Sequence, residues 1–314
     1  MLLIRSLDEL HCQFQNVSLA LGTFDGVHLA HRFVIGRTIE WSQIHAGTSM
    51  VFTFSNHPLS IIYPHRVPPQ LQNMSGKTQQ IRKLGVTVLV RIPFTRELLH
   101  LSPEEFVQLL ATKINPRHIV IGPNYSFGDK GMGTPEMLTG LAGRYGAETE
   151  ICPEVTENGV MVSSTTIRQL LSGGEVVEAA KLLGRPYELT GNVVHGDHRG
   201  RTLGFPTANL KFSPQLLVPG KGVYAARVKV GGVFYDGLCN VGVNPTFGQG
   251  SLRVETHILD FDGDIYGKRM TVFFMGLLRR EKTFASVESL VLQMQSDLKK
   301  AKKEYFSGIS ASVR

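Results

Sequence analysis

The order of hydrophobic and polar residues divides the chain into two parts with different patterns. In the first part, short β-branched runs beginning at Val17, Ser49, Val86 and Arg117 alternate with segments of helical periodicity. This alternation predicts a parallel sheet with crossover helices, the doubly wound α/β class. We therefore expect a first domain of this class over residues 1–184.

The second part, residues 185–314, has the pattern of an antiparallel β structure. Four successive segments alternate like strands, and Gly231-Gly232 is typical of a tight hairpin turn. A small closed β-barrel would pair all of these strands. Residues 286–306 have apolar positions three and four apart, which predicts an amphipathic helix lying on that barrel. Residues 167–189, just before the barrel, predict two short helices on either side of Ser172-Gly173-Gly174.

Composition limits the classes of partner. The 314 residues are 42% hydrophobic and 19% charged, enough for two domains that each bury a core. The net charge of +7 favours phosphorylated small molecules at least as much as polymers, and no nucleic-acid motif accompanies it. We expect no nucleic-acid partner, and the pattern predicts no particular oligomeric state. A DNA-binding protein is an alternative that only the isoelectric point supports.

Cysteines and apolar runs indicate the compartment. The three cysteines are far apart and lack metal-ligand spacing, so neither a disulfide framework nor a zinc site is predicted. No run approaches the ~18 apolar residues of a membrane span, and an acidic pair interrupts the start of the chain. We expect a cytoplasmic protein without a membrane partner.

The stretch LGTFDGVHLAHRF, residues 21–33, concentrates candidate chemistry directly after a predicted strand. A Gly-containing turn at the carboxyl end of a parallel strand directs the free N–H groups of the following helix at an anion. With a helix beginning near Gly26 or Val27, His28 and His31 share one face of its first turn. They could be metal ligands, a catalytic base, phosphate binders or packing residues, and Asp25 could partner a histidine or cap the helix.

Two motifs in the first part carry a family resemblance. GTFDGVHLAH, residues 22–31, resembles the Gly-x-Phe-Asp-Gly-x-His-x-Gly-His signature of the nucleotidyltransferase superfamily, and VSSTTIR, residues 162–168, resembles its downstream Ser/Thr element. The resemblance implies a Rossmann-like domain whose histidines contact ATP phosphates and stabilise the leaving pyrophosphate. By themselves, the Ser/Thr residues would indicate an ordinary helix cap rather than a nucleotide site. The implied nucleotide-binding residues are Gly22, Phe24, Asp25, Gly26, Asn56, Asn124, Ser164, Thr165 and Arg168.

The second part resembles riboflavin kinase. GNVVHGDHRGRTLGFPTANL, residues 191–210, is similar to the Gly-rich flap and Pro-Thr-Ala-Asn motif of that family, and further motifs follow in its order up to residue 284. The resemblance implies that Thr207 and Asn209 bind Mg²⁺ and phosphate and that Glu255 is the catalytic base. It also implies that ATP and the flavin contact Gly196, Gly200, Arg201 and Arg279. Without the resemblance, Glu255 reads as a solvent-facing strand residue.

Taken together, the chain resembles the bifunctional riboflavin kinase/FAD synthetase family of prokaryotes over almost its full length. The implied reactions are phosphorylation of riboflavin to FMN by ATP and adenylylation of FMN to FAD with release of pyrophosphate. The first part departs from the family pattern at Asn124 and Thr134, where aspartates are expected, and at Ala30, where glycine is expected. The alternative is therefore a riboflavin kinase whose first domain is a degenerate nucleotide- or flavin-binding module.

Overall fold

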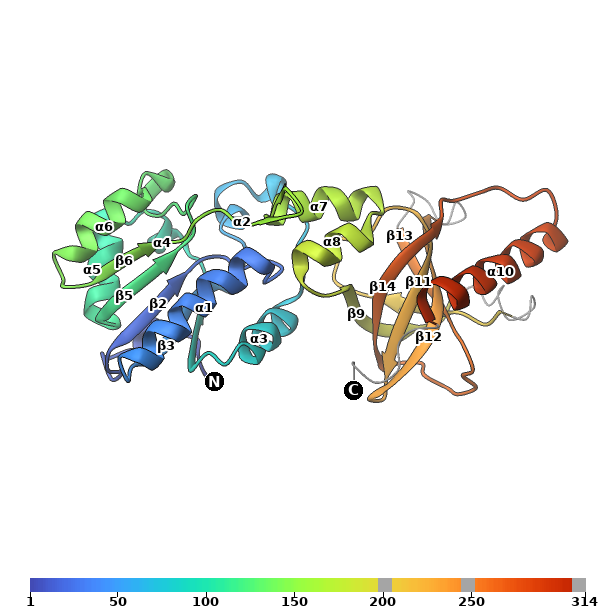
Figure 1. The fold of residues 1–314 in the computed structure, drawn as a ribbon, viewed down its shortest axis with the longest axis horizontal. Coiled ribbons are helices and arrows are strands. Elements are labelled where there is room, and N and C mark those ends of the chain that lie inside the picture. Colours follow the sequence, from blue (N-terminus) through green and yellow to red (C-terminus); the bar gives the residue numbers. More distant parts are fainter. Residues whose placement is uncertain (197–204, 244–251, 307–314) are drawn as a thin grey trace. The chain divides into compact units, whose positions relative to one another are not determined.

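The computed structural model describes residues 1–196, 205–243 and 252–306, and its chain forms two compact units (Figure 1). The first unit is Met1–Ser164 and the second is Thr165–Arg314. Our sequence-based boundary, between residues 184 and 185, lies 20 residues further along the chain (184 against 164). The difference is the pair of short helices after Ser164, which group with the second unit.

The first unit is built on a six-stranded sheet in which every neighbouring pair is parallel. In order across the sheet, the strands are β1 (Leu2–Ile4), β4 (Val88–Ile92), β3 (Thr48–Phe54), β2 (Val17–Leu21), β5 (Pro116–Ile121) and β6 (Glu148–Ile151). The doubly wound class predicted from sequence is confirmed. The order reverses between β2 and β5, and ligands of such sheets bind beyond the carboxyl ends of the strands at this point.

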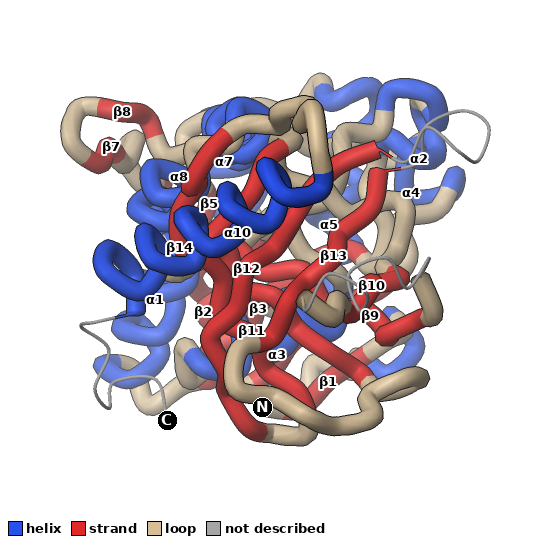
Figure 2. Tube along the Cα trace, turned by 90° about the vertical axis from the view of Figure 1, so that its right-hand side faces the viewer, coloured by secondary structure: helices blue, strands red, loops and turns tan. Residues whose placement is uncertain are grey.

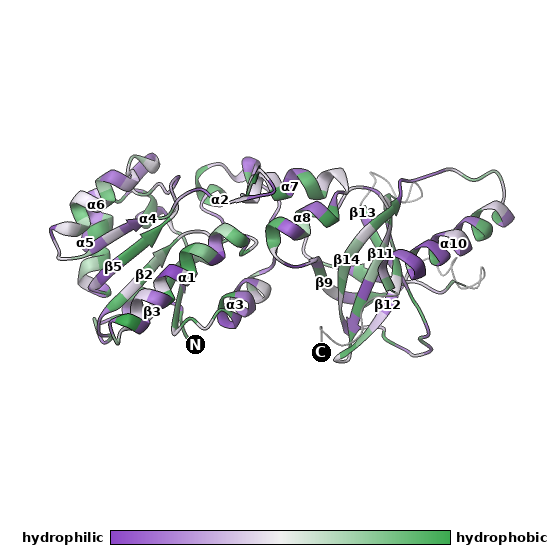
Figure 3. Cartoon of the chain, viewed as in Figure 1, coloured by the Kyte–Doolittle hydropathy of each residue, from purple (hydrophilic) through white to green (hydrophobic). Residues whose placement is uncertain are grey.

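Helices cover both faces of this sheet. One face packs against α5 (Pro103–Lys113) and α6 (Pro135–Gly143), and the other against α1 (Leu29–Ile44) and α3 (Met74–Lys83). Figure 3 shows hydrophobic and hydrophilic residues mixed around α1, as a helix that buries one face requires. Smaller elements complete the unit: η1 (Leu7–Glu9), α2 (Leu59–Ile62), η2 (Pro64–Arg66), α4 (Arg96–Leu99), η3 (Asp129–Gly131), β7 (Thr156–Glu157) and β8 (Val160–Met161).

The second unit is a closed barrel of antiparallel strands, as the sequence predicts. In order around the barrel they are β10 (Ala208–Lys211), β13 (Leu252–Ile258), β12 (Val233–Val243), β11 (Gly222–Val230), β14 (Arg269–Arg279) and β9 (Tyr187–Val194). Gly231 and Gly232 join β11 to β12 with φ of +58° and +86°, which confirms the expected hairpin turn. Tyr187, Tyr224 and Phe274 are fully buried in this unit.

Three helices and a final turn pack on the barrel. The two helices predicted around residues 172–174 are α7 (Ser164–Gly173) and α8 (Val176–Leu183), and α8 contacts β9 and β14. The predicted terminal helix is α10 (Val287–Ala301), followed by η4 (Lys302–Phe306). Figure 2 shows α10 crossing the barrel strands, and its contact with them includes buried Val223, Ala225, Leu238 and Ala301.

Candidate active sites

The loop after β2 has an unusual backbone. Phe24, Gly26 and Val27 all have positive φ, at +49°, +87° and +42°. This region is sparsely populated by any residue but glycine and is strained for a β-branched one. Helix α1 begins only at Leu29, so our expectation of a helix start near Gly26 or Val27 is wrong. These residues instead form a tight turn with left-handed backbone conformations, and the helix begins after it.

His28 is the N-cap of α1. Its Nδ1 accepts a hydrogen bond of 3.3 Å from the backbone N–H of His31. The two rings stack with centroids 3.6 Å apart and an angle of 17°, and His31 meets the edge of Phe24 at 5.2 Å. The cap geometry therefore brings the two imidazoles together. His28 does so from the position before the first turn of the helix, not from within that turn as expected.

Asp25 holds the loop in place and does not cap α1. Its carboxylate accepts hydrogen bonds of 3.1 Å from the backbone N–H of Leu71, and its carbonyl accepts one of 2.9 Å from Ser164 Oγ. The second motif predicted from sequence thus reaches the first motif through Ser164. Thr165 and Arg168 begin the second unit on α7, and their nucleotide contacts remain predictions.

A pocket of about 770 Å³ opens at the carboxyl ends of β2 and β5. Of the residues predicted to bind nucleotide, it is lined by Gly22, Phe24, His28, His31, Asn124 and Ser164. Aromatic side chains line it as well: Phe52, Phe54, Tyr63, Phe94, Phe106, Tyr125 and Phe127. The pocket thus combines a polar region around the histidines with an apolar region formed by aromatic rings.

The polar groups that line this pocket suit anions. Among the described residues that line it are three histidines (His28, His31 and His57) and Lys130, and none of these lining residues is acidic. Burial raises the pKa of the lining Cys152 thiol to about 11, so it stays protonated and chemically quiet at neutral pH.

The departures from the family pattern occupy different places. Asn124 and Ala30 line the pocket, so each can touch a bound ligand. Thr134 instead caps α6, where its Oγ1 accepts a hydrogen bond of 3.3 Å from Met137 N–H, and it is not among the lining residues. Asn56 lies beside the pocket and ties two loops together, since its side chain accepts from Phe94 N–H at 2.7 Å and donates to the Phe94 carbonyl at 3.1 Å.

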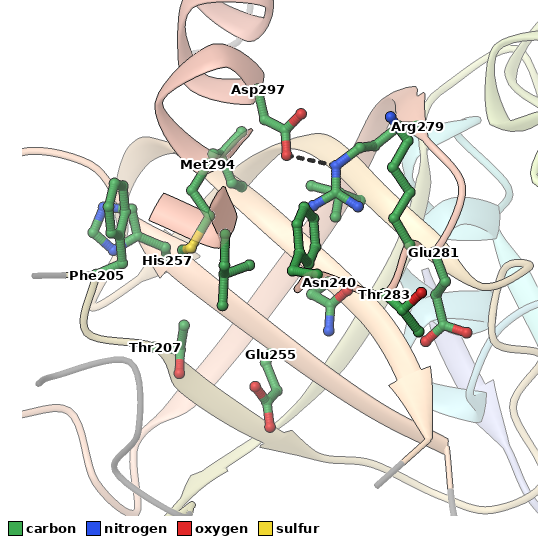
Figure 4. Close-up of a pocket in the computed structure, with 15 residues that line it drawn as sticks. Phe205, Thr207, Asn240, Glu255, His257, Arg279, Glu281, Thr283, Met294 and Asp297 are labelled. Atoms are coloured by element: carbon green, nitrogen blue, oxygen red, sulfur yellow. Dashed lines mark hydrogen bonds and ion pairs between the residues drawn. The ribbon is translucent and has the colours of Figure 1, made fainter. Parts of the chain in front are cut away.

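The second unit holds a pocket of about 860 Å³ on the outer face of the barrel, next to α10 (Figure 4). Strand register places Glu255 directly opposite Asn209 on one side and Asn240 on the other. Because opposite residues of antiparallel strands share a face, these three form a polar row across β10, β13 and β12. Figure 4 shows the side-chain oxygens of Thr207 and Glu255 directed to the same side.

Charged and apolar groups fill the rest of this pocket. Arg279 donates from Nε to Asp297 of α10 at 2.8 Å, and both side chains are nearly buried, at 12% and 5% exposed. The Arg279 guanidinium also lies 5.4 Å from the centre of the Phe284 ring. Glu255 has a cationic neighbour at 3.9 Å, Nη1 of Arg253. The remaining lining includes Phe205, Leu238, Leu290 and Met294.

A second barrel pocket, of about 510 Å³, adjoins the first. It contains Gly196, Asn209 and Thr207, and Thr207 lines both pockets. A Cβ atom on Gly196 would lie 2.1 Å from Asn209 Nδ2, so a larger residue there would displace the Asn209 side chain. Asp262, Asp264 and Tyr266 also line it. Gly200 and Arg201, predicted from the same motif, lie outside the described residues.

Sequence reasoning did not single out several residues of these sites. Asn240 and His257 line the first barrel pocket, and Lys77 lies under the β2–α1 loop. Asn240 becomes conspicuous only when the register of β12 against β13 is known. Lys77 gave no such signal, because the helix that carries it, α3, was not predicted from the sequence.

Comparison with known protein families identifies both halves of the chain. A family model described as riboflavin kinase matches residues 183–305, and one described as FAD synthetase matches residues 11–166. The bifunctional riboflavin kinase/FMN adenylyltransferase of Bacillus subtilis (strain 168) is 36% identical over 299 residues, 93% of each chain. The chain belongs to the bifunctional riboflavin kinase/FMN adenylyltransferase family.

Further relatives extend the similarity over nearly the whole length. The bifunctional riboflavin kinase/FMN adenylyltransferase of Listeria monocytogenes is 38% identical over 90% of each chain, and that of Escherichia coli (strain K12) is 32% identical over 95% of this chain and 96% of its own. A crystal structure described as a macrolide-efflux protein from Streptococcus pneumoniae superposes with a TM-score of 0.88 at 31% identity, covering 96% of this chain and 98% of that one. In the part of this chain that the structure describes, no helix is long and apolar enough to cross a membrane.

Proposed function

We propose that this member of the family catalyses two successive reactions. In the second unit, ATP phosphorylates the terminal ribityl hydroxyl of riboflavin to give FMN. In the first unit, the FMN phosphate attacks the α-phosphorus of a second ATP, giving FAD and pyrophosphate without a covalent enzyme intermediate. The observation that supports both steps is that each unit has a pocket in which an apolar region adjoins groups suited to phosphate.

For the kinase step, Glu255 is positioned to accept the proton of the attacking hydroxyl. Thr207 belongs to both barrel pockets, so the transferred phosphate would lie near it, with flavin in the larger pocket and nucleotide in the smaller one. Phe205, Phe284 and Met294 offer an apolar wall for the isoalloxazine ring. The buried ion pair of Arg279 with Asp297 joins β14 to α10, the helix that contributes Met294 to this wall.

The side chains at the junction of the two pockets fit Mg²⁺. Thr207 offers a hydroxyl oxygen and Asn209 an amide oxygen, which are the hard ligands that this ion prefers. The described residues contain no cluster of three or more acidic, histidine or cysteine side chains that could hold a metal. Mg²⁺ commonly uses one or two protein groups and completes its shell with substrate phosphates and water. When bound, it neutralises phosphate charge.

For the adenylyl transfer, His28, His31 and Ser164 form the polar region that would bind the ATP phosphates. Hydrogen-bond donors aimed at a leaving pyrophosphate stabilise the charge that develops on it. Phe54, Phe94 and Tyr125 would pack against the isoalloxazine ring of FMN. Both substrates are anions, which matches the absence of acidic side chains among the described lining residues.

One experiment separates this proposal from the kinase-only alternative. The purified full-length chain is incubated with riboflavin, ATP and Mg²⁺, and riboflavin, FMN and FAD are separated by chromatography over time. We expect FMN to appear first and FAD to follow. Formation of FMN without FAD would favour the alternative, and formation of neither would contradict the proposal.

A further inference from the structure

Lys77 is a buried cation for which the proposed chemistry has no role. It lies on α3 with 7% of its surface exposed. Its Nζ donates a hydrogen bond of 2.7 Å to the carbonyl of Thr23, in the loop between β2 and α1. Burying an ammonium group is costly unless hydrogen bonds or opposite charges compensate. The buried ammonium of Lys77 therefore requires a specific partner, and the Thr23 carbonyl of the loop between β2 and α1 is one.

The same segment holds three successive residues of that loop. Lys77 binds the Thr23 carbonyl, and Gln72 Nε2 donates to the Phe24 carbonyl at 3.3 Å. The Leu71 N–H donates to the Asp25 carboxylate at 3.1 Å. From the other side, Thr53 Oγ1 of β3 donates to the Thr23 carbonyl at 3.1 Å.

The loop needs such support because its backbone is strained. Phe24 and Val27 have left-handed φ values, and such conformations persist only where the surroundings hold them. His28 follows directly and sets the position of His31 through the cap hydrogen bond. A shift of the Thr23 carbonyl would thus move His28, five positions further along the chain (23 to 28), and His31 through the cap hydrogen bond.

We infer that Lys77 is a positioning residue for adenylyl transfer, whose ammonium fixes the loop that presents His28 and His31 to ATP. This inference rests on the proposed function of the first unit. Lys77 is not among the residues that line the 770 Å³ pocket, so it acts through the loop. It lines a small adjacent cavity together with Thr23, Asp25 and His57.

The surroundings of Lys77 also make its charge sensitive to pH. Burial lowers its pKa to about 8, the Asp25 carboxylate acts in the opposite direction, and the Arg91 guanidinium lowers it further. Besides Asp25, the titratable residue His57 lines the same cavity as Lys77. Because the ammonium form holds the loop, FAD formation should decrease as the pH rises through about 8. An arginine at this position would remain charged over the whole range.

The test compares variants of the full-length chain in FMN adenylylation, with kcat and KM for ATP measured between pH 6.5 and 9.5. Lys77→Met keeps the apolar stem and removes the charge, Lys77→Arg keeps the charge, and Thr53→Val removes the second donor to the Thr23 carbonyl. Lys83→Met, an exposed lysine of the same helix, is the matched control. Riboflavin phosphorylation in the same samples reports on the other unit.

For Lys77→Met we expect kcat/KM for ATP to fall about 10- to 100-fold, the effect of losing one charged hydrogen bond, and the decrease above pH 8 to disappear. Thr53→Val should lower kcat/KM for ATP less than Lys77→Met does. The rate of Lys77→Arg should be as high above pH 8 as at pH 7, because its charge persists. Lys83→Met should match the unaltered chain. Riboflavin phosphorylation should not change in any variant.

Two results would overturn the inference while leaving the proposed function intact. One is an unaltered chain that forms FAD at a constant rate from pH 7 to 9.5, a result that needs no variant to fold. The other is a Lys77→Met chain that unfolds more easily but whose folded fraction has normal kcat/KM and a normal pH profile, which is a purely structural role. An unaltered chain that forms no FAD contradicts the proposed function itself, and the inference with it.

Discussion

Glu255 gains its proposed role from residues on neighbouring strands. Asn209 and Asn240 lie opposite it in the sheet, and Arg253 lies 3.9 Å away on the same strand. Its side chain is 31% exposed, so it is open to a substrate and still partly shielded from water. This is the environment in which a carboxylate can orient and deprotonate an attacking hydroxyl.

Replacing Glu255 tests that role directly. Glu255→Gln keeps the shape and removes the base, so FMN formation should fall by ~10²–10⁴, the usual contribution of a positioned base. Asn209→Ala should also remove most FMN formation, because it deletes a proposed Mg²⁺ and phosphate ligand. The control is Glu304→Gln, an exposed acid of the same unit outside both pockets. Near-normal FMN formation by folded Glu255→Gln would contradict the assignment.

His28 has two roles that a single substitution would confuse. As N-cap of α1 it accepts the His31 N–H, and an alanine there costs about 0.5–2 kcal/mol of stability. As a proposed phosphate binder it supplies a donor at the pocket. Asparagine preserves the cap acceptor without the imidazole, so it separates the two roles.

We therefore predict the behaviour of His28→Asn combined with His31→Ala. Each donor lost from such a site is worth about 2.7–4 kcal/mol, so FAD formation should fall by orders of magnitude. FMN formation should hardly change, since its proposed site is built from the second unit. His65→Ala, an exposed histidine of η2, serves as control. If the double variant forms FAD at the rate of the unaltered chain, the histidines only pack and cap.

The packing of α1 against the sheet includes a buried polar network. His118 of β5 is 2% exposed, its Nδ1 lies 2.9 Å from Ser18 Oγ of β2, and its Nε2 lies 3.4 Å from Glu150 of β6. Trp41 of α1 stacks on the His118 ring at 4.9 Å. Burial lowers the His118 pKa, although the Glu150 carboxylate acts in the opposite direction.

This network predicts how stability depends on pH. Since the pKa of His118 is lower in the folded than in the unfolded chain, the unfolded chain binds a proton first as the pH falls below 6.5. The free energy of unfolding should therefore decrease from pH 7.5 to 5.5, and less so in His118→Gln. Trp41 is the one tryptophan of the sequence, so urea unfolding followed by its fluorescence reports on this unit. An equal decrease in both proteins would contradict the prediction.

The division of the chain into two units assigns α7 and α8 to the barrel. The Gly220 N–H donates to the Leu171 carbonyl at 2.9 Å, and Arg280 Nη2 donates to the Gly173 carbonyl at 2.8 Å. The Tyr224 hydroxyl donates to the Gly220 carbonyl, which extends this connection into the barrel core. Buried side chains of α7 and α8 add apolar contacts: Ile167, Leu171, Val176, Ala179, Leu182 and Leu183.

A fragment of residues 165–314 should therefore fold and phosphorylate riboflavin by itself. A fragment of residues 185–314 keeps the proposed kinase residues but loses the two helices. Each fully buried leucine contributes about 1.5–3 kcal/mol, so the shorter fragment should unfold at a lower temperature. Thermal unfolding followed by circular dichroism, with FMN formation as a second readout, checks this. Identical unfolding temperatures would show that α7 and α8 are dispensable for the barrel.

Much of the architecture could be predicted from local patterns. β2, β3, β4 and β5 are short runs rich in apolar residues, and the turn at Gly231-Gly232 needs two residues that tolerate positive φ. β1 was missed because three residues at a sheet edge carry almost no periodic signal. α3 was missed as well, since few of its residues are apolar and a lysine occupies part of its buried face.

The candidate sites divide in the same way. The loop between β2 and α1 and the Pro-Thr-Ala-Asn segment are each continuous in sequence, so their residues could be named before their geometry was known. By contrast, Asn240, Lys77 and Asp297 reach their sites from strands and helices distant in sequence. Their roles follow from strand register and helix packing, which no local pattern contains.

The sequence by itself determined the two fold classes, the order of most elements and the family, because hydrophobic periodicity and contiguous motifs are local properties of the chain. Tertiary structure alone decided that His28 caps α1, that Asp25 is bound to Leu71, and that Glu255 lies between two asparagines. It also placed Lys77 under the strained loop. These contacts depend on which donors and acceptors remain unpaired when distant segments pack together, and burial forces such groups to find one another.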